Sequence, residues 1–176
     1  MLTDRDLIER IKNEEIKMEP IDLDKQIQPA SIDLRLGDEF RKVNSNTESI
    51  VTFDSNPEYK LIKGDKIILP PLSFILATTM EYMEIPANIG GLIVGRSSIG
   101  RLTLQTENAG WVDPGYKGEI TLELFNAGEV PIELQAGRRV CQIVLFETTK
   151  EAKNPYNGKY VNQKGPTSSK ISEDVV

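Results

Sequence analysis

The feature that most constrains this chain is a series of short apolar or alternating segments, each bounded by Gly, Pro or Asn. Alternation with a period of two places successive side chains on opposite faces of a β-strand. Short strands that recur about every ten residues are typical of β-sandwiches and barrels. The sequence therefore predicts an all-β domain with strands over residues 31–36, 39–43, 60–62, 66–69, 73–78, 82–85, 89–94, 119–126, 130–134 and 139–146.

One helix is predicted at the start of the chain. Thr3 and Asp6 have the spacing of a capping box, and apolar residues then follow at helical spacing. These signals predict a short amphipathic helix over residues 4–13, within an N-terminal segment 1–20.

The chain is expected to form a single domain over residues 1–176. Its 176 residues, 39% of them apolar, suffice for one compact core and not obviously for two. Beyond Thr149 the apolar pattern stops, so residues 150–176 are predicted to form a mobile C-terminal arm.

Two local features follow from the turn residues. Gly37 ends the segment 31–36, and residues 39–43 are expected to pair back onto it as a hairpin. Residues 44–58 are mostly polar and predict a loop.

Composition excludes several kinds of site. The chain has no histidine and one cysteine, Cys141, which rules out intrachain disulfides and the usual zinc sites built from Cys and His. Cys141 lies in an apolar strand, where a small buried hydrophobe is expected. A net charge of −6 disfavours nucleic acid and anionic membranes as partners. No apolar run is long enough to span a membrane and the charged N-terminus is unlike a signal peptide, so we expect a soluble, cytoplasmic protein.

The segment GRSSIGR, residues 95–101, places two guanidiniums and two hydroxyls next to glycines. Guanidinium, hydroxyl and backbone N–H donors are the groups that bind phosphate. Charged turns without such a function are at least as common, so the motif alone leaves both interpretations open. Arg101 is either a second phosphate ligand or a residue that holds Glu123 in place.

Two carboxylates lie on either side of a tight turn in the segment 109–124 (AGWVDPGYKGEITLEL). Asp113 precedes Pro-Gly, which is a common way to begin a turn without further function. Alternation places Glu123 with Thr121 on the face opposite Ile120, Leu122 and Leu124. If that face lines a cleft, desolvation raises the pKa of the glutamate and suits it to proton transfer; if it faces solvent, Glu123 is an ordinary surface charge.

Five separated segments together resemble the dCTP deaminases of the dUTPase superfamily. They are residues 28–37 (QPASIDLRLG), 95–102 (GRSSIGRL), 109–124, 136–146 (AGRRVCQIVLF) and 155–171 (PYNGKYVNQKGPTSSKI), and they occur in the family's order. The resemblance implies a homotrimer of distorted jelly-roll (β-clip) subunits with active sites shared between neighbouring chains. It also implies Mg²⁺ carried by the nucleotide triphosphate, with no metal ligands from the protein and no zinc, and an arm that closes over the nucleotide.

The same resemblance assigns roles to residues. Glu123 is the expected proton shuttle, Ser97 orients the water, Arg101 supports the glutamate, and Asp113 lies under the deoxyribose and helps to activate water. Arg96, Ser97, Ser98 and Gln142 are expected to contact the phosphates, and Tyr156, Lys159 and Gln163 to contact the nucleotide from the arm. Trp111, Tyr116 and Thr121 complete the predicted substrate-binding set, although an isolated tryptophan is also a common core or interface residue.

Within this family some members stop at dUTP, and others continue to dUMP and pyrophosphate. Members that only deaminate tend to carry His-Arg directly before the turn, whereas this chain has Ala109-Gly110-Trp111. Gly110 is expected to leave room for a second water beside the α-phosphate, which favours the dUMP-forming reaction. Residues 104–108 depart from the family pattern, and the choice of base and inhibition by dTTP depend on that segment.

Three alternatives remain open at this point. One is a monofunctional dCTP deaminase that releases dUTP, and another is a plain dUTPase, against which the ending NQKGPTSSK argues. The third is a nucleotide-sensing binding module, which has no need for Glu123, Ser97, Arg101 and Asp113 together. The leading prediction is an enzyme that acts on dCTP and dUTP and supplies dUMP for thymidylate synthesis.

Overall fold

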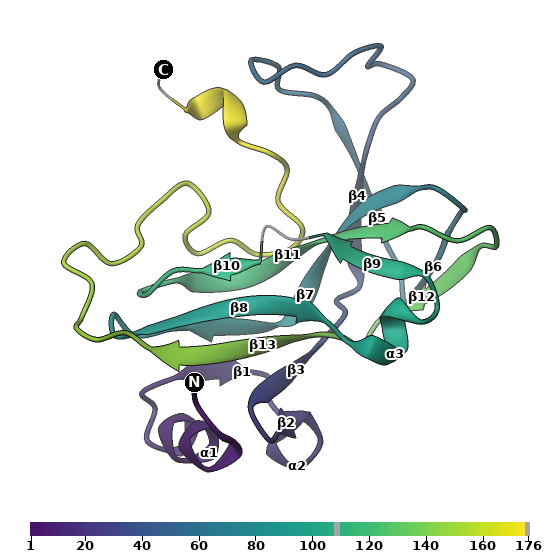
Figure 1. Cartoon of the computed structure of the whole chain (residues 1–176). Helices are drawn as coiled ribbons and strands as arrows, with labels where there is room; N and C mark the ends of the chain where they lie inside the picture. The colour runs from purple at the N-terminus through teal and green to yellow at the C-terminus, as the bar shows by residue number, and fades with distance from the viewer. Residues whose placement is uncertain (108–109, 175–176) are drawn as a thin grey trace.

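The computed structural model describes residues 1–107 and 110–174, and these form two antiparallel sheets stacked on each other and a small third sheet (Figure 1). The first sheet has the order β5 (Tyr59–Lys63), β4 (Glu39–Val43), β7 (Phe74–Glu84), β11 (Lys117–Asn126) and β9 (Leu104–Glu107), and β1 (Lys17–Glu19) pairs with β7. The second has the order β10 (Trp111–Val112), β8 (Ile89–Gly95), β13 (Arg139–Glu147), β3 (Ser31–Arg35) and β2 (Ile27–Gln28). The third consists of β12 (Ile132–Gln135) and β6 (Lys66–Leu69).

The described helices are short: α1 (Asp4–Lys12), α2 (Leu23–Gln26), α3 (Ser97–Gly100) and the 3₁₀ helix η1 (Ile171–Glu173), which lies on the C-terminal arm apart from the sheets. The predicted N-terminal helix is confirmed as α1, and its capping box is formed, since the backbone N–H of Thr3 donates to Asp6 Oδ2 at 2.8 Å. The prediction of an all-β fold with a leading helix is also confirmed. None of the helices in the described ranges is long and apolar enough to cross a membrane.

A single apolar core fills the space between the two large sheets. Ala77 and Leu124 enter it from the first sheet, and Leu34, Cys141 and Ile143 enter it from the second, all of them without solvent exposure. Cys141 is therefore the small buried hydrophobe that was predicted, and burial raises the pKa of its thiol. This core holds the strands that carry the candidate site residues in fixed register.

The predicted hairpin of residues 31–36 and 39–43 is wrong, because the two strands belong to different sheets. β3 pairs with β13 and β2, whereas β4 pairs with β5 and β7. The chain crosses between the sheets at Gly37, whose N–H donates to Thr78 O at 2.8 Å. A Cβ at Gly37 would come within 2.6 Å of the Thr78 side chain, so the crossing requires a glycine.

Two of the predicted strands, 73–78 and 82–85, form one continuous strand, β7. Thr79 and Glu81, which lie between the two predicted segments, are buried and hydrogen-bonded. Thr79 Oγ1 donates to Glu81 O at 3.0 Å and accepts from the N–H of Ile120 at 3.0 Å. The remaining predicted strands are confirmed, with ends that differ by no more than two residues.

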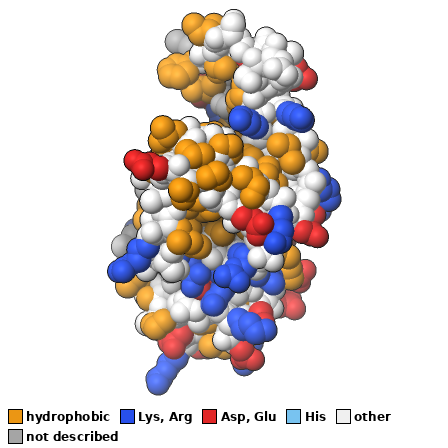
Figure 2. All heavy atoms as spheres, turned by 90° about the vertical axis from the view of Figure 1, so that its right-hand side faces the viewer, with side chains coloured by type: hydrophobic (Ala, Val, Ile, Leu, Met, Phe, Trp, Pro, Cys, Tyr) orange, Lys and Arg blue, Asp and Glu red, His pale blue; other side chains and the backbone are white. Residues whose placement is uncertain are grey.

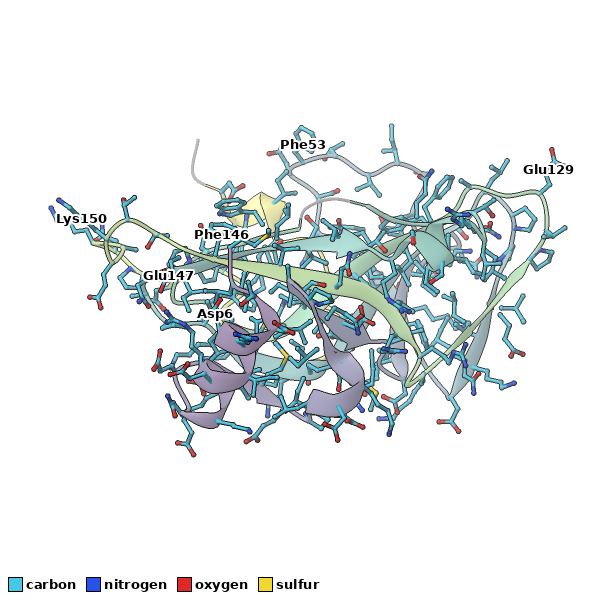
Figure 3. The ribbon with its side chains drawn as sticks, turned by 60° about the horizontal axis from the view of Figure 1, so that its bottom comes forward. Asp6, Phe53, Glu129, Phe146, Glu147 and Lys150 are labelled. Atoms are coloured by element: carbon cyan, nitrogen blue, oxygen red, sulfur yellow. The ribbon has the colours of Figure 1, made fainter. Side chains whose placement is uncertain are left out.

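Residues 44–58 form the predicted loop, which projects from the body of the molecule between β4 and β5 (Figure 1). Phe53 lies far out on this loop, and Figure 3 shows it on the outside of the molecule. At the opposite side of the molecule from this loop, Glu147, the last residue of β13, lies beside α1 and forms an ion pair with Arg10 (Figure 3).

The C-terminal arm runs back along the first sheet beside β11. The N–H of Tyr156 donates to Pro114 O at 2.8 Å, and the N–H of Glu119 donates to Gln163 O at 3.0 Å. Further along, the N–H of Thr167 donates to Thr121 Oγ1 at 3.0 Å. The arm therefore covers the same face of β11 that carries Thr121.

Candidate active site

Two cavities contain most of the predicted site residues. The Glu123 cavity has a volume of about 390 Å³ and lies between β11, the turn after β10, the first residues of β5 and β7, and the arm. The Arg96 cavity has a volume of about 600 Å³ and lies between the start of α3, β3 and β13. The Glu123 cavity is lined by the predicted residues Trp111, Asp113, Tyr116, Thr121, Glu123, Tyr156 and Gln163, and the Arg96 cavity by Arg96, Ser97, Ser98 and Gln142.

β11 presents Glu123 to its cavity as alternation predicts. Leu122 and Leu124 are buried in the core, while Thr121 and Glu123 lie half-buried on the opposite face and line the cavity. Ile120 was expected to share the core face with Leu122; it packs partly buried against the core and also lines the cavity. The pairing of β11 with β7 shifts register between Glu119 and Thr121, and such an irregularity re-aims the side chains near it.

The turn after β10 brings Asp113 to the mouth of the Glu123 cavity. The N–H of Tyr116 donates to Asp113 O at 3.1 Å, so Asp113 begins a turn and also lines the cavity. Trp111 Nε1 donates to Asp113 Oδ1 at 2.9 Å and thereby orients this carboxylate. Trp111 is 60% exposed and packs its ring against Phe146, so it is not a core residue.

Tyr116 and Gln163 form the contact between the cavity and the arm. The Tyr116 hydroxyl donates to Glu119 O at 2.7 Å and accepts from Gln163 Nε2 at 2.9 Å. Burial raises the pKa of the Tyr116 phenol, which therefore remains protonated at neutral pH. Gln163 Oε1 is buried with no hydrogen-bond partner in residues 1–107 and 110–174, so this cavity-lining residue retains an acceptor.

The arm contributes more residues to the Glu123 cavity than the sequence indicated. Tyr156 packs against Tyr116 with ring centroids 5.7 Å apart, as expected for a residue of the closing arm. Tyr160 and residues 167–169 also line the cavity and were not predicted. The hydroxyl-rich run at 167–169 is the sequence signal that could have indicated them.

Lys159 does not line the Glu123 cavity. Its ammonium group donates to Lys170 O at 3.0 Å and forms an ion pair with Asp174 at 2.5 Å. In this structure Lys159 thus ties two parts of the arm together, and its contact with a nucleotide stays a prediction.

The Arg96 cavity is held open by ion pairs and hydrogen bonds. Arg96 Nε lies 3.1 Å from Asp33 Oδ1, and Arg96 Nη1 donates to Arg139 O at 3.0 Å. Gln142 is oriented by Ser31, whose hydroxyl donates to Gln142 Oε1 at 3.1 Å. Burial raises the pKa of Asp33, and the two neighbouring guanidiniums, from Arg96 and Arg139, oppose this shift. The cavity presents hydrogen-bond donors suited to phosphate oxygens.

The predicted catalytic residues do not all meet within one chain. Ser97 lines the Arg96 cavity, and Arg101 is exposed at the end of α3, where its N–H donates to Ser97 O at 3.0 Å. Arg101 lines neither the Glu123 cavity nor the Arg96 cavity. The support of Glu123 by Arg101 therefore stays a prediction.

Gly110 has a packing role that the sequence did not suggest. The N–H of Ile93 donates to Gly110 O at 2.7 Å, and a Cβ at position 110 would come within 2.5 Å of Ile93 O. Ala109, the first residue of the predicted motif, and Asn108, the last residue of the segment 104–108, lie outside the described residues. Residues 104–107 form β9 beside β11, and their effect on the choice of base stays a prediction.

No group of three or more His, Cys, Asp and Glu residues in the described ranges is arranged to hold a metal ion. The Glu123 cavity presents carboxylates and aromatic rings, and the Arg96 cavity presents a guanidinium, hydroxyl groups, the Gln142 amide and the Asp33 carboxylate.

A family model described as dCTP deaminase-like matches residues 1–148. The chain belongs to this family. Its curated relatives include proteins named "dCTP deaminase, dUMP-forming" from Persephonella marina, 43% identical over 99% of this chain and 98% of the relative, and from Aquifex aeolicus, 40% identical over 99% and 96%. A relative from Halorubrum lacusprofundi, 42% identical over 99% of this chain and 92% of its own, is named "dCTP deaminase". The family resemblance read from the five sequence segments is confirmed.

Solved structures show the same fold. The 2′-deoxycytidine 5′-triphosphate deaminase from Agrobacterium tumefaciens matches 82% of this chain with a TM-score of 0.66 at 23% identity, and this chain spans 46% of its length. The dUTPase of Staphylococcus bacteriophage 80α matches 85% of this chain and 95% of its own with a TM-score of 0.51 at 14% identity. The prediction of a dUTPase-like fold is confirmed.

Proposed function

We propose that this chain hydrolyses dCTP to dUTP and ammonia and then cleaves dUTP to dUMP and pyrophosphate. The observation that carries the proposal is the Glu123 cavity, which Glu123 and Asp113 line together with residues of the arm. Relatives that cover nearly the whole chain are named "dCTP deaminase, dUMP-forming", which supports both steps.

In the first step a water attacks C4 of the cytosine. Glu123 accepts a proton from this water and delivers it to N3, and it then moves the proton of the new C4 hydroxyl to N4. The C4–N4 bond breaks, ammonia leaves, and the C4 oxygen becomes the carbonyl of uracil. General acid–base transfer of this kind needs a carboxylate within hydrogen-bond reach of both atoms. Glu123 fits this role because it lies half-buried on a rigid strand, with Phe74 and Leu76 also lining its cavity.

In the second step a water attacks the α-phosphorus. The bond from this phosphorus to the oxygen that bridges the α- and β-phosphates breaks, and pyrophosphate leaves. Asp113 is the proposed acceptor of the water proton, and Trp111 orients it through the 2.9 Å hydrogen bond. A fixed carboxylate loses less entropy in reaching the reactive geometry.

The triphosphate brings Mg²⁺ with it in this proposal. The Arg96 cavity offers guanidinium, hydroxyl and amide groups, which suit phosphate oxygens better than a bare cation. Arg96, Ser97 and Ser98 would hold the phosphates, whose own oxygens ligate the metal. The ion neutralises phosphate charge when bound, and Gln142 adds a further polar contact.

The separation of the two cavities supports a homotrimer with shared sites. In it, the Arg96 cavity of one chain binds the phosphates of a nucleotide whose base lies in the Glu123 cavity of a neighbour. Apolar side chains gather on one face of the chain, with Lys and Arg beside them (Figure 2). Ile68, Leu72 and Val130 are 56%, 73% and 67% exposed and are available to a neighbouring copy.

dTTP, which shares the triphosphate and the deoxyribose with the substrate, is the proposed inhibitor.

The proposed reaction is tested by incubating the protein with dCTP and Mg²⁺ and resolving ammonia, dUTP, dUMP and pyrophosphate over time. We expect dUMP and pyrophosphate to appear with ammonia, and Glu123→Gln to slow ammonia release by roughly 10²- to 10⁴-fold. Glu133→Gln, at an exposed carboxylate on β12, is the matched control. Accumulation of dUTP would show a monofunctional deaminase, and cleavage of added dUTP without any ammonia from dCTP would show a dUTPase.

The shared site is tested by mixing two inactive variants. Arg96→Gln and Glu123→Gln are expected to be inactive alone and to regain activity when refolded together, because some sites then receive both intact residues. Absence of any recovery, with mixed oligomers demonstrated by tagged chains, would contradict the shared site.

A further inference from the structure

Asp33 lies directly behind Arg96, and neither proposed reaction step uses it. This carboxylate on β3 is only 1% exposed. Its Oδ1 lies 3.1 Å from Arg96 Nε, and its Oδ2 lies 3.1 Å from Arg139 Nη1. One carboxylate between two guanidiniums leaves an excess positive charge at a wall of the Arg96 cavity, which Asp33 also lines.

The contacts of Arg96 fix the direction of its guanidinium. Nε is bound by Asp33, and Nη1 donates to Arg139 O at 3.0 Å. The guanidinium is planar and rigid, so two fixed nitrogens determine where Nη2 points. A free arginine loses rotamer entropy when it binds a phosphate, whereas a held one has lost it before binding.

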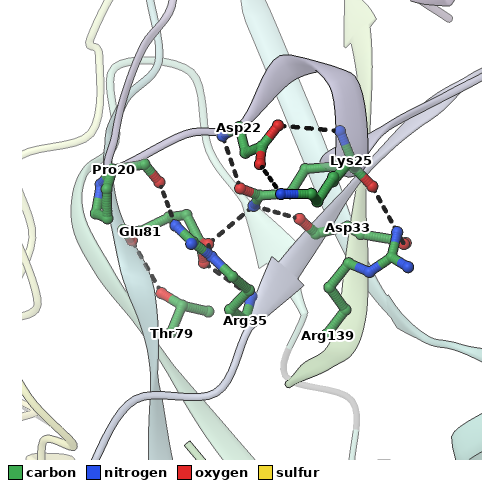
Figure 4. A network of polar contacts seen from close by, with 9 residues as sticks. Pro20, Asp22, Lys25, Asp33, Arg35, Thr79, Glu81 and Arg139 are labelled. Carbon is green, nitrogen blue, oxygen red and sulfur yellow. Dashed lines mark hydrogen bonds and ion pairs between the residues drawn. The ribbon is translucent and has the colours of Figure 1, made fainter. Parts of the chain in front are cut away.

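Asp33 is itself held in place by a buried polar network (Figure 4). Gln26 Nε2 donates to Asp33 O at 2.8 Å and to Glu81 Oε1 at 2.9 Å, and both Gln26 and Glu81 are buried. Arg139 donates to Lys25 O at 2.5 Å, which joins α2 to the same cluster. The network links α2, β3, β7 and β13 behind the cavity and leaves Asp33 little freedom to move.

We propose that Asp33 is a positioning residue that aims the Arg96 guanidinium and thereby sets the affinity of the chain for the triphosphate part of its substrate. The identity of the substrate rests on the proposed function, whereas the affinity for a polyphosphate rests on the cavity itself. A guanidinium held in one orientation makes charge-assisted hydrogen bonds to phosphate oxygens without first having to be ordered.

Calorimetric titration with inorganic tripolyphosphate and Mg²⁺ tests this proposal without requiring catalysis. We expect Asp33→Asn to weaken tripolyphosphate binding about tenfold, the effect of one charged hydrogen-bond contact. Arg96→Gln is expected to weaken it at least as much. The double variant is expected to bind no more weakly than Arg96→Gln alone, because Asp33 acts through Arg96.

Glu81→Gln is the matched control for a merely structural effect. Glu81 is a buried carboxylate of the same network, but its ion pair is with Arg35 at 2.7 Å, away from the Arg96 cavity. We expect Glu81→Gln to lower the melting temperature and to leave tripolyphosphate affinity unchanged, because the Asp33 carboxylate keeps its two arginine partners and Gln26 can still donate to Asp33 O. Asp33→Glu keeps the charge but displaces it by one methylene, so it is expected to fold and still weaken binding even if Asp33→Asn does not fold.

Steady-state kinetics with dCTP separates this inference from the proposed function. We expect Asp33→Asn to raise KM for dCTP about tenfold with kcat nearly unchanged. Unchanged tripolyphosphate affinity in Asp33→Asn, an equal loss in Glu81→Gln, or additive losses in the double variant would each overturn the positioning role. Asp33-dependent tripolyphosphate binding in a chain that leaves dCTP intact would uphold the positioning role and contradict the proposed function.

Discussion

The Glu119 carboxylate accepts a hydrogen bond of 2.6 Å from the backbone N–H of Gly165 and so joins β11 to the arm. Thr78 donates to the same oxygen at 3.3 Å, which holds the carboxylate in position. Next to this contact, Gly118 and Gln163 form a parallel β-bridge. Glu119 therefore anchors the part of the arm that closes the Glu123 cavity.

Removal of this anchor is expected to loosen the arm. Glu119→Ala leaves the Gly165 N–H without its charged acceptor, and we expect KM for dCTP to rise about tenfold. Backbone hydrogen exchange at Gly165 and Thr167 should become faster, as measured by mass spectrometry. Glu84→Ala removes an ion pair with Lys117 on the same sheet and is the control. If hydrogen exchange at Gly165 and Thr167 is equally fast in both variants, Glu119 does not anchor the arm.

Gly110→Ala is expected to destabilise the chain by about 1–3 kcal/mol, because the added Cβ overlaps Ile93 O. Urea unfolding measures this loss. Gly100→Ala is the matched control, since a Cβ at Gly100 meets nothing within 4 Å. Equal stability of the two variants would show that the backbone near Ile93 can accommodate a Cβ at position 110 without loss of stability. The amount of dUTP that Gly110→Ala releases separately tests the proposed second water.

Asp6 is expected to make stability depend on pH at the acid end. The backbone N–H of Thr3 lowers the pKa of Asp6 below its usual value of 3.8. Because the pKa of Asp6 is lower in the folded state than in the unfolded state, the ionised carboxylate stabilises the fold. This stabilisation is complete above pH 3.8 and is lost as the pH falls through the folded-state pKa. Asp6→Asn should therefore be less stable than the wild type at neutral pH and equal to it in strong acid. A difference that persists in acid would contradict the capping role.

Cys141 is expected to be unreactive in the folded chain. Burial among apolar residues raises the pKa of its thiol, and the thiolate is the reactive form. An aromatic disulfide reagent should react with it only after urea unfolding. Cys141→Ser is expected to cost about 1–3 kcal/mol, because a buried hydroxyl would lack a partner. Rapid labelling without urea would show that the core opens near β13.

The strands could be predicted from the sequence because each depends on local alternation, as at β11. The pairing of strands could not, because it is set by distant partners. The segment after Gly37 reads locally as a hairpin, yet β4 pairs with β5 and β7 in the other sheet. Short elements such as β10 and α3 were missed because two to four residues carry too little periodicity.

Residues of one strand or turn come together in the structure as the sequence grouped them, while their roles stay predictions. Glu123, Thr121 and Asp113 all line the cavity to which the motifs assigned them. Ile120 packs against the core as alternation predicts, but its contact with the cavity could not be predicted, because the register shift in β11 depends on the pairing with β7. Tyr160 and residues 167–169 were missed because their position depends on hydrogen bonds that the arm makes to β11.

The measurement that tests the central claim most directly is the conversion of dCTP in ¹⁸O-labelled water with analysis of the dUMP formed. If the protein carries out both hydrolyses, the dUMP formed contains ¹⁸O from water at the C4 oxygen of uracil and on its phosphate. Glu123→Gln is expected not to form this doubly labelled dUMP. Labelled dUTP that never yields dUMP would contradict the second step. Unchanged dCTP beside a folded, tripolyphosphate-binding chain would contradict the assignment of Glu123 as the proton shuttle of a deaminase.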